Sequence, residues 1–209
     1  MMTDMTMDNF LAVLSSSEPV PGGGGACGYV AAVGMSLGNM VLALTIGKKK
    51  YAEYQEEIEE LIVKATDLTK RLAECMDKDA ESFKPLAAAY GLPKDTEEQI
   101  KEREAIMAKA LVTASEAPLS MMEFILEAMK LIDRISVIGS RIAISDAGVG
   151  ITMCEAAMKG ASLNVFINTK LMKDRELAED MNFKADKMLA EAAQIEEETF
   201  GRVMDAVRP

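Results

Sequence analysis

The sequence predicts an all-α fold, a single-domain helical bundle with one uncharged helix at its centre. Apolar residues recur at spacings of three and four over most of the 209 positions, which is the period of an amphipathic helix. Strand-like alternation is nearly absent, and aromatic residues make up only 5% of the chain. No internal repeat and no long linker divides the sequence, so residues 1–209 are expected to form one domain.

The first predicted element is a short helix that precedes a run of glycines. Residues 7–14 carry apolar side chains at helical spacing, and Thr6 is the expected N-cap. Ser, Pro and Gly residues then break the pattern as far as the four glycines at 22–25.

An uncharged helix is expected over 26–45. Its length and the lysines that follow it would suit a membrane span. Its Gly and Ala content, and the charged amphipathic helices elsewhere in the chain, favour the centre of a bundle instead. Gly28, Gly34 and Gly38 predict close contacts between this helix and its neighbours.

A long helix follows, with an apolar seam at spacings of three and four from Tyr51 to Cys75. The same spacing next reaches Asp79 and Ser82, and apolar residues then resume. The Gly-Leu-Pro sequence at 91–93 is a stop signal, so the helix is expected to end there.

Three more helices complete the prediction. Thr96 begins a capping-box pattern at the start of a helix over 97–138. Pro118 lies within that stretch and removes a backbone hydrogen bond, so a kink or a short break is expected just before it. Helices over 141–168 and 173–202 follow, the first rich in small residues.

The composition restricts the possible chemistry. The chain has no His, which excludes Ser-His-Asp and Cys-His catalysis and His-ligated metals within it. Its three widely spaced cysteines fit neither a disulfide framework nor a metal site, so we expect no metal and a cytoplasmic location. With 23 Lys and Arg against 34 Asp and Glu, the net charge of −11 argues against nucleic acid or an anionic membrane as a partner.

Asp79 and Asp146 are the most informative polar residues, because each interrupts an apolar helix seam. A carboxyl group in such a place is costly unless it is paired, hydrogen-bonded or protonated. It can have a raised pKa and serve as an acid or a base near neutral pH. The alternative is a buried cap or a partner for Lys or Arg.

Three further groups have both a functional and a structural interpretation. The glycines at 22–25 are either a ligand-facing turn before a helix N-terminus or a flexible linker. Lys48–Lys50 either hold carboxylates of an acidic ligand or form a solvated helix start. Asn164 and Asn168 lie four apart, and are either ligand-binding amides on one helix face or caps.

Several sequence motifs resemble one known family. They are PVPGGGG, TIGKKKY, DAESF, GLPKDTEEQIKER, ASEAPLSMME and SDAGVGITMCEAAMKGASLNVFIN, and together they cover nearly the whole chain in the family's order. This set resembles the formiminotransferase-cyclodeaminase C-terminal family, which includes formimidoyltetrahydrofolate cyclodeaminases and bacterial methenyltetrahydrofolate cyclohydrolases. The chain departs from the pattern at Gly25, where a Ser is usual, and at Ser140, where an Asn is common.

The resemblance implies an all-helical homodimer with a folate site near the glycine turn and the subunit contact. It implies a tetrahydrofolate derivative as substrate, with or without a polyglutamate tail, and no prosthetic group. Asp79 and Asp146 are the expected catalytic residues. The expected substrate-binding residues are Gly22, Gly23, Gly24, Lys48, Lys49, Lys50, Tyr51, Ser82, Asn164 and Asn168.

Of the family's two reactions, we favour the cyclohydrolase, in which water opens the methenyl bridge to give 10-formyltetrahydrofolate. The chain carries no formiminotransferase domain that would make the formimino substrate in place. The cyclodeaminase reaction, which releases ammonia, is the alternative. A non-catalytic helical dimer that binds folate or another anion is a second alternative.

Overall fold

The computed structural model describes all of residues 1–209 and contains helices but no strands, as the sequence predicts. The six α-helices are α1 (Met7–Leu14), α2 (Gly23–Ala43), α3 (Gln55–Tyr90), α4 (Glu97–Ile138), α5 (Ile144–Thr169) and α6 (Arg175–Val207). Short 3-10 segments lie at Met2–Asp4, Lys49–Tyr54 and Arg141–Ala143.

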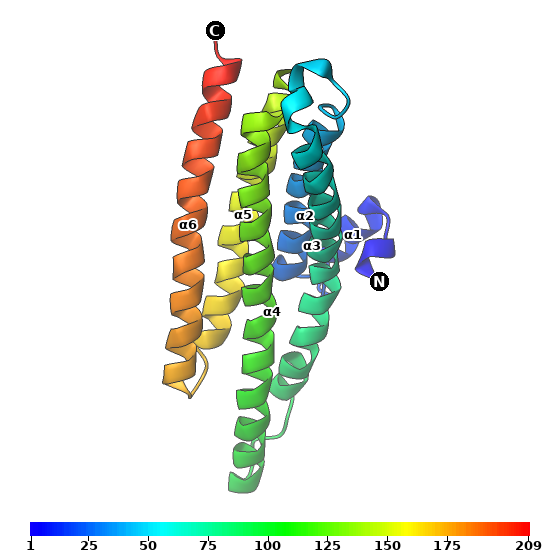
Figure 1. Cartoon of the computed structure of the whole chain (residues 1–209). Helices are drawn as coiled ribbons and strands as arrows, with labels where there is room; N and C mark the ends of the chain where they lie inside the picture. Colours follow the sequence, from blue (N-terminus) through cyan, green and yellow to red (C-terminus); the bar gives the residue numbers. More distant parts are fainter.

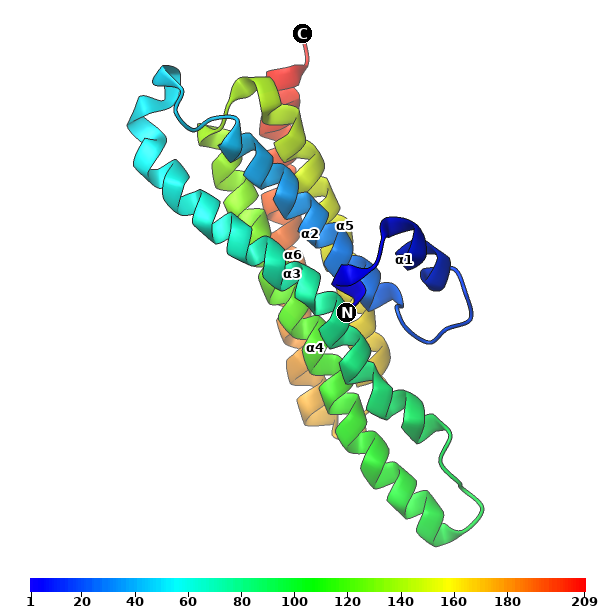
Figure 2. The same cartoon turned by 90° about the vertical axis from the view of Figure 1, so that its right-hand side faces the viewer.

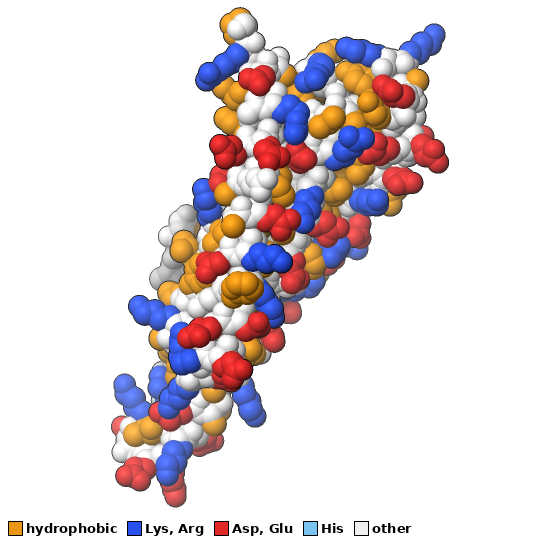
Figure 3. Space-filling view, turned by 60° about the vertical axis from the view of Figure 1, so that its left-hand side comes forward, with side chains coloured by type: hydrophobic (Ala, Val, Ile, Leu, Met, Phe, Trp, Pro, Cys, Tyr) orange, Lys and Arg blue, Asp and Glu red, His pale blue; other side chains and the backbone are white.

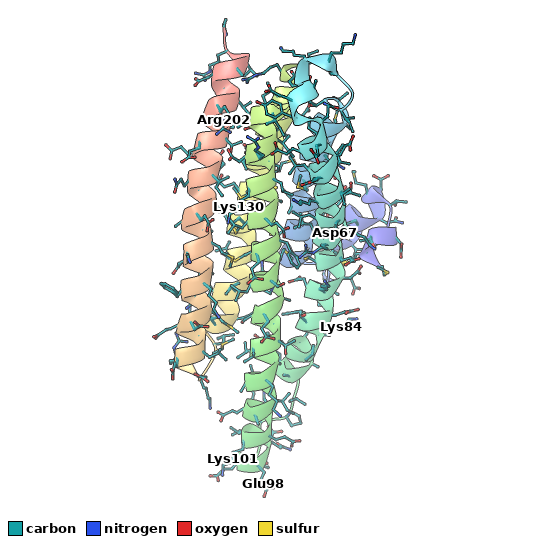
Figure 4. All side chains as sticks on the ribbon, viewed as in Figure 1. Asp67, Lys84, Glu98, Lys101, Lys130 and Arg202 are labelled. Atoms are coloured by element: carbon teal, nitrogen blue, oxygen red, sulfur yellow. The ribbon has the colours of Figure 1, made fainter.

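Helices α2 to α5 form the body of an elongated bundle, and α6 packs on the outside against α4 and α5 (Figure 1). The short α1 lies to one side of the bundle (Figure 2). The hairpin between α3 and α4 projects beyond the ends of the other helices in both views. Glu98 and Lys101 mark this projection (Figure 4).

The uncharged helix α2 is the centre of the bundle because its glycines allow close approach on three sides. Side chains added at Gly28, Gly34 and Gly38 would meet α3, α5 and α4 respectively. This confirms the predicted reason for glycines within a helix, where each costs about 1 kcal/mol against Ala.

The membrane alternative for this segment can be compared with its surroundings. Gly23–Ala43 is the one helix whose length and mean hydropathy of 1.5 would suit a membrane span. In the fold, 44% of the most apolar 18-residue stretch of this helix is buried, and α2 packs against α3, α4 and α5. These contacts make α2 the core helix of the bundle, which is the alternative that the sequence favours over a membrane span.

Two local features differ from the predictions. The glycines form neither a turn nor a linker before the helix, because α2 begins at Gly23 with Gly22 as its N-cap. Of the kink or short break expected before Pro118, the break is absent, since α4 continues through that residue. Tertiary packing holds both segments helical: Gly24 and Gly25 are buried, and a side chain from α5 bonds the carbonyl that Pro118 leaves free.

Other local signals were confirmed. The hydroxyl of Thr6 accepts the Asn9 N–H, and Thr96 begins a complete capping box at the start of α4. The outer helix α6 is tied to α4 by ion pairs of Lys130 with a glutamate and of Arg202 with an aspartate, at 2.6 and 2.7 Å (Figure 4). Acidic and basic side chains are interspersed over the face drawn in Figure 3, with no extended basic patch.

Candidate functional site

A pocket of about 250 Å³ opens at the N-terminal end of α2. It brings together the glycine segment, one acidic residue from α3 and two amides from α5, with α4 closing it at Ala114. The lining residues are Pro19, Val20, Gly22, Gly23, Gly24, Asp79, Phe83, Ala114, Asn164, Ile167 and Asn168.

Asp79 is seated on the first turn of α2. Gly22, the N-cap, has no side chain to bond the free N–H groups, and the Gly25 N–H donates to the Asp79 carboxylate. A Cβ on Gly24 would come well under 3.0 Å from the Asp79 carboxyl atoms. The glycines therefore make room for a carboxylate that caps α2 from another helix.

The environment of Asp79 also changes its acidity. Burial raises the pKa of its carboxyl group above the usual range, and the hydrogen bond from Gly25 opposes this rise. No Lys or Arg lies among the pocket residues to favour the ionised form. On α2, burial and the Asp79 charge raise the pKa of Cys27 to about 11, which keeps that thiol protonated. Asp79 is thus both a cap and a candidate acid–base group.

The side-chain amides of the two pocket asparagines bond to the protein through their nitrogens and not through their oxygens. Asn164 donates from Nδ2 to the Gly160 carbonyl at 3.0 Å, and Asn168 donates from Nδ2 to the Ala114 carbonyl at 2.8 Å. Their amide oxygens receive no hydrogen bond from the protein. The pocket side chains therefore offer hydrogen-bond acceptors, and the free N–H groups at the start of α2 are the available donors.

The remaining predicted residues lie mostly at the other end of α2. Lys48 donates to the Ser140 hydroxyl at 3.2 Å, and the Arg141 N–H donates to the Tyr51 hydroxyl at 3.1 Å. This last hydrogen bond, with the charges of Lys50 and Lys48, lowers the pKa of Tyr51. Since α2 spans 21 residues, this cluster and the pocket are separated by about 30 Å within one chain.

The structure thus divides the predicted site. Asp146 lies in the first turn of α5, eighteen residues and about 27 Å along the helix from Asn164. Lys49 and Lys50 are exposed beside Lys48. Ser82 lines a separate hollow between α3 and α4.

Five apolar pocket residues were missed by the sequence analysis: Pro19, Val20, Phe83, Ala114 and Ile167. Phe83 lies one helical turn after Asp79, and Ile167 lies on the same turn of α5 as the two asparagines. Phe83 and Ile167 each share a helix face with a predicted site residue, so helical spacing could have indicated them.

The fold and the pocket define a class of protein: an α-helical bundle that holds a half-buried carboxyl group and two amides around a glycine-rich helix N-terminus. The sequence profile of the formiminotransferase-cyclodeaminase family matches residues 6–187, and the chain belongs to this family.

Similar proteins support this membership. A methenyltetrahydrofolate cyclohydrolase from Methylorubrum extorquens is 38% identical over 202 residues, covering 97% of each chain. The formimidoyltransferase-cyclodeaminase of Mus musculus is 28% identical over 189 residues, 90% of this chain and 35% of that protein. The chain therefore spans about a third of that longer relative. The crystal structure of a formiminotetrahydrofolate cyclodeaminase from Thermotoga maritima shares the fold, with a TM-score of 0.81, 23% identity and coverage of 99% and 98%.

Proposed function

We propose that this protein is a methenyltetrahydrofolate cyclohydrolase, converting 5,10-methenyltetrahydrofolate and water to 10-formyltetrahydrofolate. The observation that carries the proposal is Asp79, a half-buried carboxyl group in an acceptor-lined pocket. The similarity to the Methylorubrum extorquens cyclohydrolase covers nearly the whole of both chains and supports this reaction.

The pocket suits a cationic methenyl carbon. An ionised Asp79 stabilises the positive charge shared between N5 and N10 and accepts a proton from the attacking water. The water oxygen then bonds to the methenyl carbon, and the bond from that carbon to N5 breaks as N5 takes the proton held by Asp79. The remaining hydroxyl proton leaves to solvent as the formyl C=O forms, which removes the positive charge of the methenyl substrate. The pterin lies against the glycines and Phe83, and the amide oxygens of Asn164 and Asn168 bind its N–H groups.

A second reaction is favoured by the raised pKa of Asp79. In a cyclodeaminase, N10 attacks the formimino carbon and ammonia leaves, which requires a proton donor for the departing nitrogen. Burial raises the pKa of this carboxyl group, which makes it better able to hold and deliver that proton. We propose no prosthetic group for either reaction, and a cytoplasmic location, which suits the three free cysteines.

Both reactions can be tested side by side. We expect enzyme-dependent loss of the methenyltetrahydrofolate absorbance with formation of 10-formyltetrahydrofolate, and little ammonia from 5-formiminotetrahydrofolate. Ammonia release as the faster reaction would assign the cyclodeaminase instead. Tight folate binding without turnover of either substrate would leave only a non-catalytic binding protein.

We also propose that the protein is a homodimer formed through the outer face of α5. On this face Val149, Leu163 and Ile167 are 52%, 67% and 63% exposed. A small residue, Ala156, lies between them and would allow a second helix to approach closely. An apolar stripe of this kind is typical of a buried helix contact.

A two-fold antiparallel contact centred near residue 155 would unite the divided site. Asp146 and Asn164 are separated by five helical turns, so they lie on the same flank of α5. The two-fold axis would place Asp146 of the partner subunit beside Asn164 in the pocket. The same rotation carries the Lys48–Lys50 end of the partner toward the pocket, where lysines can meet the glutamate carboxylates of folate.

Complementation tests this dimer. Asp79→Asn and Asp146→Asn are each expected to be inactive, whereas co-expressed subunits should regain about a quarter of wild-type activity, because half of the dimers carry one intact site. Differently tagged subunits allow mixed dimers to be purified, and light scattering gives their mass. A monomeric mass, or mixed dimers with no activity, would contradict the arrangement.

A further inference from the structure

Pro118 lies inside α4, where a proline leaves a backbone carbonyl without its helical partner. The missing N–H would have bonded the carbonyl four residues earlier, which belongs to Ala114. Both residues are buried. A buried carbonyl without a hydrogen bond is unfavourable, so another donor is required.

That donor is Asn168 from α5. Its Nδ2 bonds the Ala114 carbonyl at 2.8 Å, although the two residues are 54 positions apart. Asn168 is only 8% exposed. Because a carbonyl can only accept, the amide must direct its NH₂ group toward α4, and its oxygen is left for the pocket that Asn168 lines.

We propose that Pro118 is a positioning residue for this pocket: it frees the Ala114 carbonyl to orient Asn168, so that the pocket presents an acceptor to a cationic or N–H-rich ligand. Asn164 is oriented in the same way by its bond to the Gly160 carbonyl. With Asp79, these oxygens form a set of three acceptors, and no Lys or Arg lines the pocket. The ligand group that this set selects is positively charged or rich in N–H donors, such as an amidinium. The inference rests on the proposed function for its kinetic test.

The chain contains its own control for the effect of a proline within a helix. Pro85 lies inside α3, on an exposed position, and frees the carbonyl of Glu81. No side chain donates to that carbonyl, and neither residue lines the pocket. Replacing Pro85 therefore changes a helix without changing an amide in the pocket.

The test compares Pro118→Ala with Pro85→Ala. Both restore an N–H within a helix, so neither is expected to lower the Tm. Pro118→Ala should raise the KM for methenyltetrahydrofolate about tenfold, with kcat changed much less, because one oriented hydrogen bond to a charged ligand is weakened. Pro85→Ala should leave KM unchanged. Asn168→Ala should raise KM to a similar degree, and adding Pro118→Ala to it should have no further effect.

A spectroscopic measurement decides the inference without any turnover. The side-chain amide resonances of Asn168, assigned by their loss in Asn168→Ala, should move in Pro118→Ala and stay in place in Pro85→Ala. Unchanged resonances, or equal KM changes in the two proline variants, would overturn the inference. A wild-type protein that turns over neither folate would refute the proposed function, and the resonances would still test the role of Pro118.

Discussion

Asp79→Asn is expected to lower kcat/KM by about 10²–10⁴-fold, the usual contribution of a general acid or base. Asparagine keeps an oxygen that can accept the Gly25 N–H, so the cap on α2 is retained. The variant loses the negative charge and the proton-accepting group. Steady-state kinetics on methenyltetrahydrofolate measure this effect directly.

The thermal stability of Asp79→Asn, unlike its activity, should not fall. A carboxyl group whose pKa is raised by folding binds its proton more tightly in the folded state. The stability therefore falls as pH rises from the ordinary value of 3.8 through the raised value, and Asp79→Asn removes this fall. We expect the Tm of Asp79→Asn at pH 7 to equal or exceed that of the wild type.

Glu81→Gln is a matched control. It removes one negative charge from the same helix, at an exposed position. It should leave both kcat/KM and Tm nearly unchanged. If Asp79→Asn keeps its activity while remaining folded, Asp79 is only a helix cap and the proposed mechanism fails.

Gly34→Ala is expected to destabilise the fold by about 1–3 kcal/mol, the usual cost of overpacking a core. An added Cβ would come under 3.0 Å from the Gly150 carbonyl oxygen and the Cys154 Sγ, both on α5. A backbone atom cannot move aside as a flexible side chain can, so α2 and α5 must separate. Urea unfolding measures the change in the free energy of unfolding.

Gly201→Ala makes the same chemical change where nothing lies within 4 Å. Gly201 is inside α6 and exposed, so alanine should stabilise the protein by up to about 1 kcal/mol through helix propensity alone. The two substitutions should therefore have opposite signs. A Gly34→Ala protein as stable as the wild type would show that the contact between α2 and α5 is looser than the structure describes.

Much of the fold could be predicted from the sequence because helices are specified locally. The apolar seam of α3 includes Ile58, Leu72 and Cys75, and all three are buried. The capping box at Thr96 needs only four consecutive residues, and the glycines of α2 indicate close packing wherever their partners lie. Each of these signals depends on a spacing of a few residues along the chain.

The site was only partly predictable, because it depends on contacts between helices. From sequence, Asp79 and Asp146 are equally strong candidates, because each interrupts the apolar seam of its own helix. Periodicity assigns a residue to a helix face, but it does not show which other helix covers that face. The structure places Asp79 in the pocket and Asp146 about 27 Å along α5 from Asn164. The glycines were predicted as a turn because the carboxylate that caps them comes from a distant part of the chain.

The sequence by itself determined the helical class, the caps at Thr6 and Thr96 and the acid at position 79 that interrupts an apolar seam. Only the tertiary structure decided what that acid meets, and what Pro118 does. From sequence, Pro118 is a lost hydrogen bond and predicts a kink or a short break in α4. In the fold, the freed Ala114 carbonyl bonds Asn168, and α4 remains continuous. The reason is physical: helix formation depends on neighbours within a turn or two, whereas a pocket depends on side chains that packing brings together from separate helices.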